Sequence, residues 1–266
     1  MGVTITSDPF TSAVPEVPLK AAPLARVIAQ VRFPLVASFA RLEGISGFQD
    51  VIRGDYPILR HEKAHTFVVG QEGLEAKASD TTIWRFHDKA DRWRVSLTTE
   101  FVAVETSNYT GRAELLDRLK SVLAALQPSG SIAVYDRLGV RYINRISGAL
   151  LSEIGRLVRP EVLGIAGRKF DAQLVHTFTE SSFILKQGRM TVRSGRIPAG
   201  ATPDPTAIVP IDVESWLLDL DMFTVTFGEF ELERIMKQAE EFSSTIYSFF
   251  RWSVEDEFLR RFGGDL

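Results

Sequence analysis

The chain of 266 residues carries the same short motifs twice, in the same order. Val31-Arg32-Phe33 returns as Val140-Arg141-Tyr142, each inside an apolar, strand-like run that a short helical segment follows. A second motif, Gly111 to Lys120, returns as Gly228 to Lys237. The copies are offset by 109 residues for the first motif and by 117 for the second, which agree within the length of loop insertions. The sequence therefore predicts an internal duplication.

Each half is predicted to have the element order βαβββα. The strands expected in the first half are 23–33, 66–70, 82–87 and 93–106, followed by a helix from 113 that Pro128 ends. Those of the second half are 132–146, 170–179, 183–186, 190–193 and 216–227, one strand more than this order contains, followed by a helix from 230. Antiparallel strands backed by one long helix per half indicate an α+β fold with one curved antiparallel sheet. This element order resembles that of the TATA-binding-protein-like and helix-grip folds.

The chain divides into an arm and two repeats. Residues 1–20 contain three prolines and no periodicity, so we expect a flexible N-terminal arm. Residues 21–128 form the first predicted α+β repeat and 131–266 the second. The Pro-rich stretch 198–210 interrupts the second repeat and is expected as an exposed loop.

Composition excludes several classes of protein. The net charge of −3 provides no global basic field, and residues 211–266 hold 13 acidic and 5 basic side chains. With no cysteine, the chain has no disulfide, thiolate metal site or cysteine nucleophile. No apolar run approaches the roughly 18 residues of a membrane span, and no signal pattern opens the chain, so we expect a cytoplasmic protein without membrane contact.

The motifs that carry a family resemblance are spread over nearly the whole chain. They are Pro23-Leu24, Tyr56-Pro57, Trp84-Arg85-Phe86, the segment from Arg137 to Ile146 (RLGVRYINRI), Leu220-Asp221 and Phe250-Arg251-Trp252. On these residues the chain resembles a sporadically distributed bacterial family of uncharacterised hypothetical proteins of similar length. The resemblance implies a bacterial protein in a mobile-gene or defence neighbourhood. The family has no assigned activity, so the resemblance assigns no catalytic residue.

His61-Glu62-Lys63-Ala64-His65 matches the H-E-x-x-H pattern of zinc hydrolases. That chemistry needs a helix, so that both imidazoles project from one face toward the metal. Pro57 lies just upstream, and the β-branched run 66–70 follows the second histidine directly. We therefore expect a polar loop that enters a strand, and we predict no metal site and no cofactor.

Arg137, Arg141 and Arg145 recur at even spacing, which places all three on one face of a strand. Arg32 occupies the equivalent place in the first copy. A row of guanidinium groups on an open sheet face can bind phosphates or carboxylates. The alternative is a solvated face whose arginines pair with cross-strand acids such as Glu105. These four arginines are the candidate ligand- or partner-binding residues.

Two further groups have weaker functional interpretations. Asp219 and Asp221 share a strand face, as paired metal ligands would, but two carboxylates alone do not make a metal site, and we favour solvent-facing alternation as their explanation. The stretch from Trp84 to Arg94 alternates aromatic and basic residues, as in proteins that stack nucleic-acid bases. Trp84 and Phe86 also share one strand face, which favours a place in the core.

Every catalytic pattern is incomplete, so we expect a non-enzymatic binding or assembly module rather than an enzyme. Its partner would be a protein or a second copy of the chain, bound on a concave, arginine-bearing sheet face. A nucleic-acid-interacting protein that uses the same face is the alternative. An unrecognised metal-dependent hydrolase is the weaker one.

Overall fold

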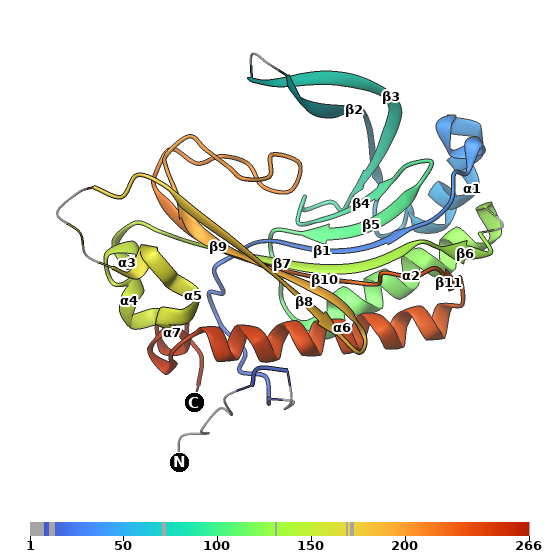
Figure 1. The fold of residues 1–266 in the computed structure, drawn as a ribbon. Helices are drawn as coiled ribbons and strands as arrows, with labels where there is room; N and C mark the ends of the chain where they lie inside the picture. Colours follow the sequence, from blue (N-terminus) through green and yellow to red (C-terminus); the bar gives the residue numbers. More distant parts are fainter. Residues whose placement is uncertain are drawn as a thin grey trace.

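A computed structural model describes residues 8–10, 14–70, 73–130, 132–168, 170 and 173–265. This part of the chain has an α+β fold with an antiparallel sheet of nine strands (Figure 1), which confirms the predicted fold class. The strands are β1 (Leu24–Arg32), β2 (Ile58–Gly70), β3 (Gly73–His87), β4 (Trp93–Leu97), β5 (Phe101–Thr106), β7 (Arg137–Ser147), β8 (Thr177–Leu185), β9 (Gly188–Ile197) and β10 (Ser215–Phe223). A separate small pair consists of β6 (Val134–Tyr135) and β11 (Gly228–Glu229).

The two long helices, α2 (Arg112–Gly130) and α6 (Leu232–Ser253), run along one face of the sheet (Figure 1). The shorter helices are α1 (Leu42–Ile52), α3 (Ala149–Ser152), α4 (Ile154–Leu157), α5 (Pro160–Leu163), α7 (Asp256–Arg261) and the 3-10 turns η1 (Ala37–Ala40) and η2 (Gly164–Gly167). No helix in the described part of the chain is long and apolar enough to span a membrane.

The main core lies between the sheet and these helices, and the apolar periodicities explain it. In β1, Val27, Ala29 and Val31 are buried toward the helices, while the residues between them point to the other face. On α6 the buried side chains recur every three or four residues, which gives one apolar stripe: Ile235, Ala239, Phe242, Ile246 and Phe249. Both patterns are those from which the sequence predicted these elements.

The strand order places the first strand of each predicted half at the centre of the sheet. The order is β2-β3-β4-β5-β1-β7-β10-β9-β8, so β1 and β7 are neighbours. β1 pairs on its other side with β5, the last strand before α2. β7 pairs on its other side with β10, the last strand before α6. The two predicted halves therefore meet through their first strands.

Several predicted boundaries are wrong. The strand expected at 93–106 is two strands, because the Thr98 hydroxyl accepts hydrogen bonds from the amides of Glu100 and Phe101 and so forms a tight turn. The first half consequently has four strands after α1 instead of three. The segments expected at 170–179, 183–186 and 190–193 form only two strands, β8 and β9. Helix α2 continues through Pro128 to Gly130.

The Pro-rich stretch 198–210 is not simply an exposed loop. Its Ala207 and Ile208 are buried on the sheet face opposite the helices, where they pack with Ile143 and Leu217. The loop turns back onto the sheet because these two apolar side chains remove surface from water there. Together with the β2–β3 hairpin it rises above this second face of the sheet (Figure 1).

Candidate functional site

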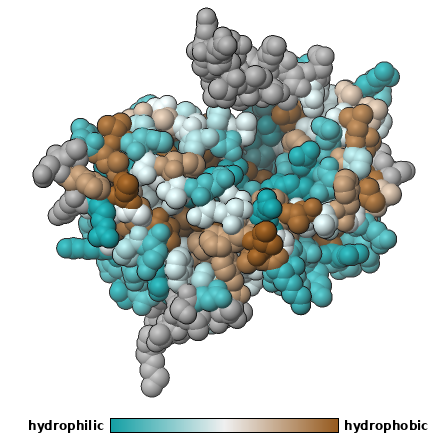
Figure 2. Space-filling model, in the orientation of Figure 1, coloured by the Kyte–Doolittle hydropathy of each residue, from teal (hydrophilic) through white to brown (hydrophobic). Residues whose placement is uncertain are grey.

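A cavity of about 650 Å³ lies on the sheet face opposite the helices. Its walls are strands β1, β3, β4, β5, β7 and β10, the base of β2, and residues 205–209 of the Pro-rich stretch. We call this space the open-face cavity. Figure 2 shows the molecule in the orientation of Figure 1. Hydrophilic and hydrophobic residues are intermixed around the hollow in this surface.

Strand alternation supplies the polar floor of the open-face cavity. Arg26, Ile28 and Gln30 of β1 line it, while the residues between them are buried on the helix side. The same alternation directs Arg85 of β3 and Arg94 of β4 into it. Several arginines therefore converge on one space from strands that are adjacent in the sheet.

Glu105 on β5 holds two of these arginines. Arg94 donates two hydrogen bonds to its carboxylate, from Nε at 2.9 Å and Nη2 at 2.8 Å. Arg85 donates from Nη1 at 3.2 Å, and the Ser96 hydroxyl at 2.6 Å. Burial opposes ionisation of Glu105, but the hydrogen bonds from Arg94 and Ser96 and the charges of Arg94 and Arg85 together outweigh it and lower the pKa of the carboxyl. Glu105 is therefore a buried carboxylate with its acceptor positions already in use.

Arg26 lies beside this group without a carboxylate partner of its own. Its Nε donates to the carbonyl oxygen of Ala207 at 3.2 Å, and no ion pair joins it to an acid among the described residues. Burial lowers the pKa of Arg26, and the nearby Arg94 and Arg85 lower it further against the attraction of Glu105. Its guanidinium therefore provides positive charge that the protein does not neutralise at close range.

Arg141, in the middle of the predicted arginine row, is fully committed to partners within the protein. Its Nε and Nη2 each donate to Asp219 at 2.8 Å, and its Nη1 donates to Asp204 at 2.7 Å. Burial alone would lower the pKa of Arg141, but the hydrogen bonds and charges of Asp219 and Asp204 together reverse this and raise it. Arg141 therefore ties β7 to β10 and to the Pro-rich stretch.

Arg137 is also committed to partners within the protein. Its Nη2 donates to Asp221 at 2.9 Å, its Nη1 to Gln30 at 3.4 Å, and the guanidinium carbon lies 4.4 Å from the centre of the Phe223 ring. Gly139 leaves the space for this guanidinium, since an added Cβ would lie 2.8 Å from Arg137 Nη1. Arg137 lines the open-face cavity with its charge already paired.

The other two predicted arginines, Arg145 and Arg32, have different contacts. Arg145 donates to the carbonyl oxygen of Val209 at 3.0 Å, so it also binds the Pro-rich stretch. Arg32 lies outside the open-face cavity, half-exposed, with its Nε 3.8 Å from Asp136. The structure thus does not bring the four predicted arginines together in one site. Arg137 and Arg141 follow the alternative interpretation, in which arginines pair with cross-strand acids.

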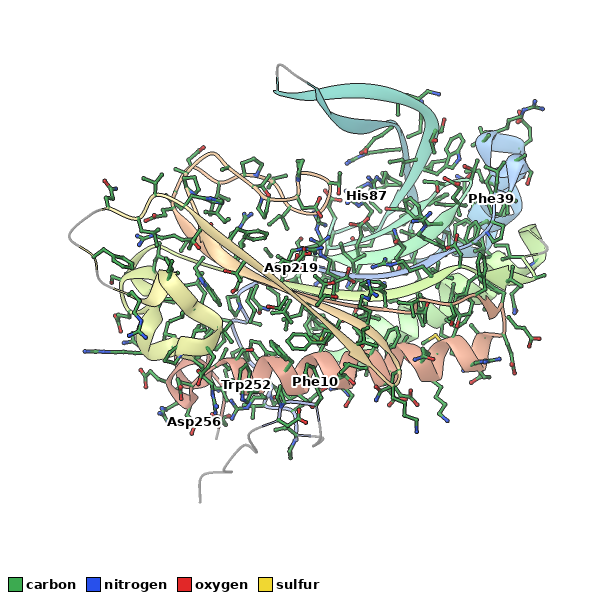
Figure 3. The ribbon with its side chains drawn as sticks, viewed as in Figure 1. Phe10, Phe39, His87, Asp219, Trp252 and Asp256 are labelled. Atoms are coloured by element: carbon green, nitrogen blue, oxygen red, sulfur yellow. The ribbon has the colours of Figure 1, made fainter. Side chains whose placement is uncertain are left out.

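Asp219 and Asp221 do share a face, but Asp219 is buried, Asp221 is partly buried, and both pair with arginines instead of facing solvent. Asp219 lies on β10 (Figure 3), 3% exposed, between Arg141 and Arg193. Burial raises the pKa of Asp221, and Arg137 offsets this only in part. In the part of the chain that the structure describes, no three His, Asp or Glu side chains form a group that could hold a metal.

The two remaining sequence motifs have structural roles. Trp84 and Phe86 are buried in the core, and the Trp84 Nε1 donates to the Phe39 carbonyl at 2.7 Å, so the core interpretation is correct. The segment from His61 to His65 lies within strand β2, whereas we expected a loop entering a strand. A strand does not place the two imidazoles as the zinc-hydrolase pattern requires. The side chain of His65 lies outside the described residues.

Comparison with known proteins found no matching family model and no significantly similar curated protein. The geometry of the open-face cavity therefore carries the functional argument.

The charges around the open-face cavity nearly balance. Among the described residues, six cationic side chains and three carboxylates line it. Two more carboxylates, Asp204 and Asp219, lie against Arg141 and neutralise it. The balance is about one positive charge, and Arg26 is the arginine in this group that contacts no carboxylate.

The sequence interpretation missed Arg26 and the central role of Glu105. The sequence does indicate the orientation of Arg26. It lies six residues before Arg32 on the same strand, and residues an even number of positions apart point to the same face. Nothing in the sequence indicated that β4 and β5 would form separate paired strands and place Arg94 opposite Glu105.

Proposed function

We propose that the protein is a non-enzymatic binding module that holds a carboxylate-bearing segment of a partner protein in the open-face cavity. The observation that carries this proposal is the Arg26 guanidinium, which lies in the cavity without a carboxylate partner. A guanidinium binds a carboxylate through two parallel hydrogen bonds, and this pairing is strong where water is partly excluded. Ile28, Ile83 and Phe101 provide apolar surface beside it for the aliphatic parts of such a segment.

The charge arrangement favours a protein segment over nucleic acid. Nucleic-acid binding relies on several cations that are free to replace counterions along a phosphate backbone. Here Arg85, Arg94, Arg137 and Arg141 already bind carboxylates of the protein. A second phosphate would meet Glu105 or Asp221 instead of an unpaired cation. One excess charge suits a single carboxylate on an otherwise neutral segment.

Selection of binders from a displayed library of random peptides tests the proposal. We expect the selected peptides to share one Asp, Glu or terminal carboxylate, and Arg26→Gln to weaken their binding at least about tenfold, the loss of one charge-assisted interaction. Arg32→Gln is the matched control, since Arg32 lies on the same strand face but outside the cavity. Peptides without a common acid, or equal losses in the two variants, would overturn the proposal.

Electrophoretic shift assays address the nucleic-acid alternative. We expect no binding of single-stranded or duplex DNA at moderate salt. Tight binding that falls steeply with added salt, and that Arg26→Gln reduces, would favour nucleic acid. Arg141→Glu is unsuitable here, because that change would also release Asp219 and Asp204 from their ion pairs.

We further propose that the two halves arose by duplication of one α+β unit, residues 21–128 and 131–266. Support comes from pairing register and helix starts. Val31 of β1 pairs with Val102 of β5, and Val140 of β7 pairs with Met222 of β10. The two partner residues, Val102 and Met222, are 120 positions apart in the sequence. Helices α2 and α6 begin at Arg112 and Leu232, which are also offset by 120, so the sequence motif that pairs Gly111 with Gly228 at an offset of 117 is three residues out of register with the helices. The bacterial family setting and the cytoplasmic location stay proposals on the sequence patterns given above.

A further inference from the structure

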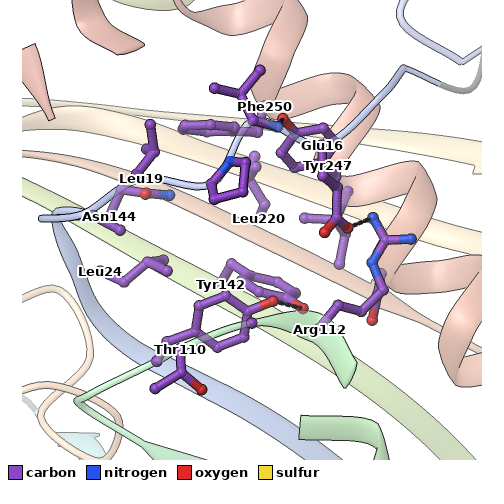
Figure 4. Close-up of a pocket in the computed structure, with 17 residues that line it drawn as sticks. Glu16, Leu19, Leu24, Thr110, Arg112, Tyr142, Asn144, Leu220, Tyr247 and Phe250 are labelled. Carbon is purple, nitrogen blue, oxygen red and sulfur yellow. Dashed lines mark hydrogen bonds and ion pairs between the residues drawn. The ribbon is translucent and has the colours of Figure 1, made fainter. Parts of the chain in front are cut away.

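A second cavity lies on the opposite, helix-covered side of the sheet. It has a volume of about 220 Å³ and is bounded by β1, β7, β10, the start of α2, helix α6 and the N-terminal segment 16–22. Figure 4 shows the segment crossing the cavity, with Glu16 and Leu19 on its rim. We call it the helix-side cavity. It is separate from the open-face cavity, with no lining residue in common.

The walls of the helix-side cavity are mainly apolar and aromatic. Leu24, Leu220, Ile246 and Phe250 form much of this surface. An apolar cavity of 150 Å³ in another protein is large enough to bind benzene. The helix-side cavity therefore has room for a small molecule with one ring and a short substituent.

Three hydroxyl groups converge on the floor of this cavity. The Tyr109 and Tyr142 hydroxyls lie 3.4 Å apart, joined by one weak hydrogen bond, so one of the two protons has no acceptor in this pair (Figure 4). Burial raises the pKa of both phenols, so both stay protonated. The Ser243 hydroxyl is 2% exposed; it lies near enough to Tyr142 to lower the phenol pKa somewhat, yet makes no hydrogen bond of normal geometry.

Tyr142 and Asn144 make the helix-side cavity more polar than the rest of the core. Both project from β7 toward the helices, where the alternating positions are otherwise apolar. The Asn144 amide makes one long hydrogen bond, 3.4 Å to the Leu218 carbonyl. Buried polar side chains with so few partners carry a free-energy cost unless a ligand or water satisfies them.

The charged groups at the rim are already paired with each other. Among the described residues that line the cavity, Glu16 and Arg112 are the charged ones, and they form an ion pair (Figure 4). The Val17 amide donates to the Tyr247 hydroxyl at 2.6 Å, which holds the N-terminal segment across the cavity. An ionic ligand would have to break this pair or lie beside it in an apolar space.

We propose that the helix-side cavity binds a small uncharged molecule, mainly apolar and aromatic, that presents one oxygen acceptor to the Tyr142, Tyr109 and Ser243 hydroxyls. Apolar walls bind the body of the ligand, and the unshared hydroxyl protons bind its oxygen. This site is independent of the partner-binding function proposed above.

Titration with three matched probes, followed by NMR or calorimetry, tests this site. We expect acetophenone, which has a neutral carbonyl, to bind more tightly than ethylbenzene, which has no acceptor, and benzoate to bind least. Tyr142→Phe removes a donor and keeps the ring, so it should weaken acetophenone about tenfold and leave ethylbenzene unchanged.

Ala22→Leu provides a second test, because it adds volume inside the cavity without removing a polar contact. It should abolish binding of both neutral probes, while thermal unfolding confirms that the variant is folded. The proposal is overturned if no probe binds the wild type, if benzoate binds best, or if Tyr142→Phe weakens both neutral probes equally. Binding that survives in folded Ala22→Leu would place the probes elsewhere and also overturn it.

Discussion

Arg94 binds Glu105 through two parallel hydrogen bonds, directly across the pair of strands β4 and β5. The carboxylate is buried in the floor of the open-face cavity, and Arg85 and Ser96 bind the same group. Glu105 accepts four hydrogen bonds from Arg94, Arg85 and Ser96, while the neighbouring Arg26 forms no ion pair with it and keeps its charge available. The ion pair thus organises the structure around the proposed binding residue.

We predict that Glu105→Gln lowers the free energy of unfolding by about 3 kcal/mol, since it leaves the partly buried Arg94 without a carboxylate and Arg85 with the exposed Glu62 alone. Asp221→Asn is the matched control. Arg137 keeps Gln30 and the Phe223 ring as partners there, so the expected loss is about 1 kcal/mol. Urea denaturation measures both. A smaller loss for Glu105→Gln than for Asp221→Asn would contradict the central role of Glu105.

The same two carboxyls should affect acid stability in opposite directions. The folded-state pKa of Glu105 is lowered, so its contribution is full above the unfolded pKa of about 4.3 and is lost as pH falls through the folded value. We expect Glu105→Gln to flatten the decline in the free energy of unfolding below that pH. Burial raises the pKa of Asp221, so Asp221→Asn should steepen the decline. Denaturant titrations from pH 6 to pH 3 measure these slopes.

Asp204→Asn should loosen the Pro-rich stretch while most of the fold keeps its stability. Asp204 accepts a hydrogen bond from Arg141 and also binds the amide and hydroxyl of Thr206. We expect a global loss of about 1 kcal/mol, since Arg141 keeps both bonds to Asp219. Amide hydrogen exchange in residues 204–208 should accelerate at least tenfold, against little change in β7. Unchanged exchange in this stretch would show that Asp204 does not anchor it.

Two glycines of the sheet should respond differently to the addition of a methyl group. At Gly195 an added Cβ would lie 2.0 Å from the Thr177 carbonyl oxygen, so Gly195→Ala must separate β8 from β9 and cost more than about 4 kcal/mol. At Gly139 the nearest atom is the flexible end of Arg137, which can move. We expect a cost of about 1–2 kcal/mol for Gly139→Ala. Thermal unfolding of the two variants ranks them, and the reverse order would contradict this geometry.

Local periodicity was sufficient to predict much of the architecture. Because side chains alternate along a strand, the spacing of Arg137, Arg141 and Arg145 correctly placed them on the face opposite Leu138 and Val140. The apolar stripe of α6 likewise predicted a helix on the other side of the sheet. These properties depend on residues a few positions apart, so a single sequence contains them.

The partners of those arginines depend on contacts between distant segments. Asp219 meets Arg141 only because β10 pairs with β7, 78 residues away along the chain, and Asp204 reaches it only because a Pro-rich stretch turns back onto the sheet. The alternation of side chains along β7 predicts the face on which each arginine lies. It does not predict whether that arginine contacts water, an acid or a cavity. Arg26 therefore became the candidate binding residue, and Arg141 a structural one, through strand order and burial, which no local pattern encodes.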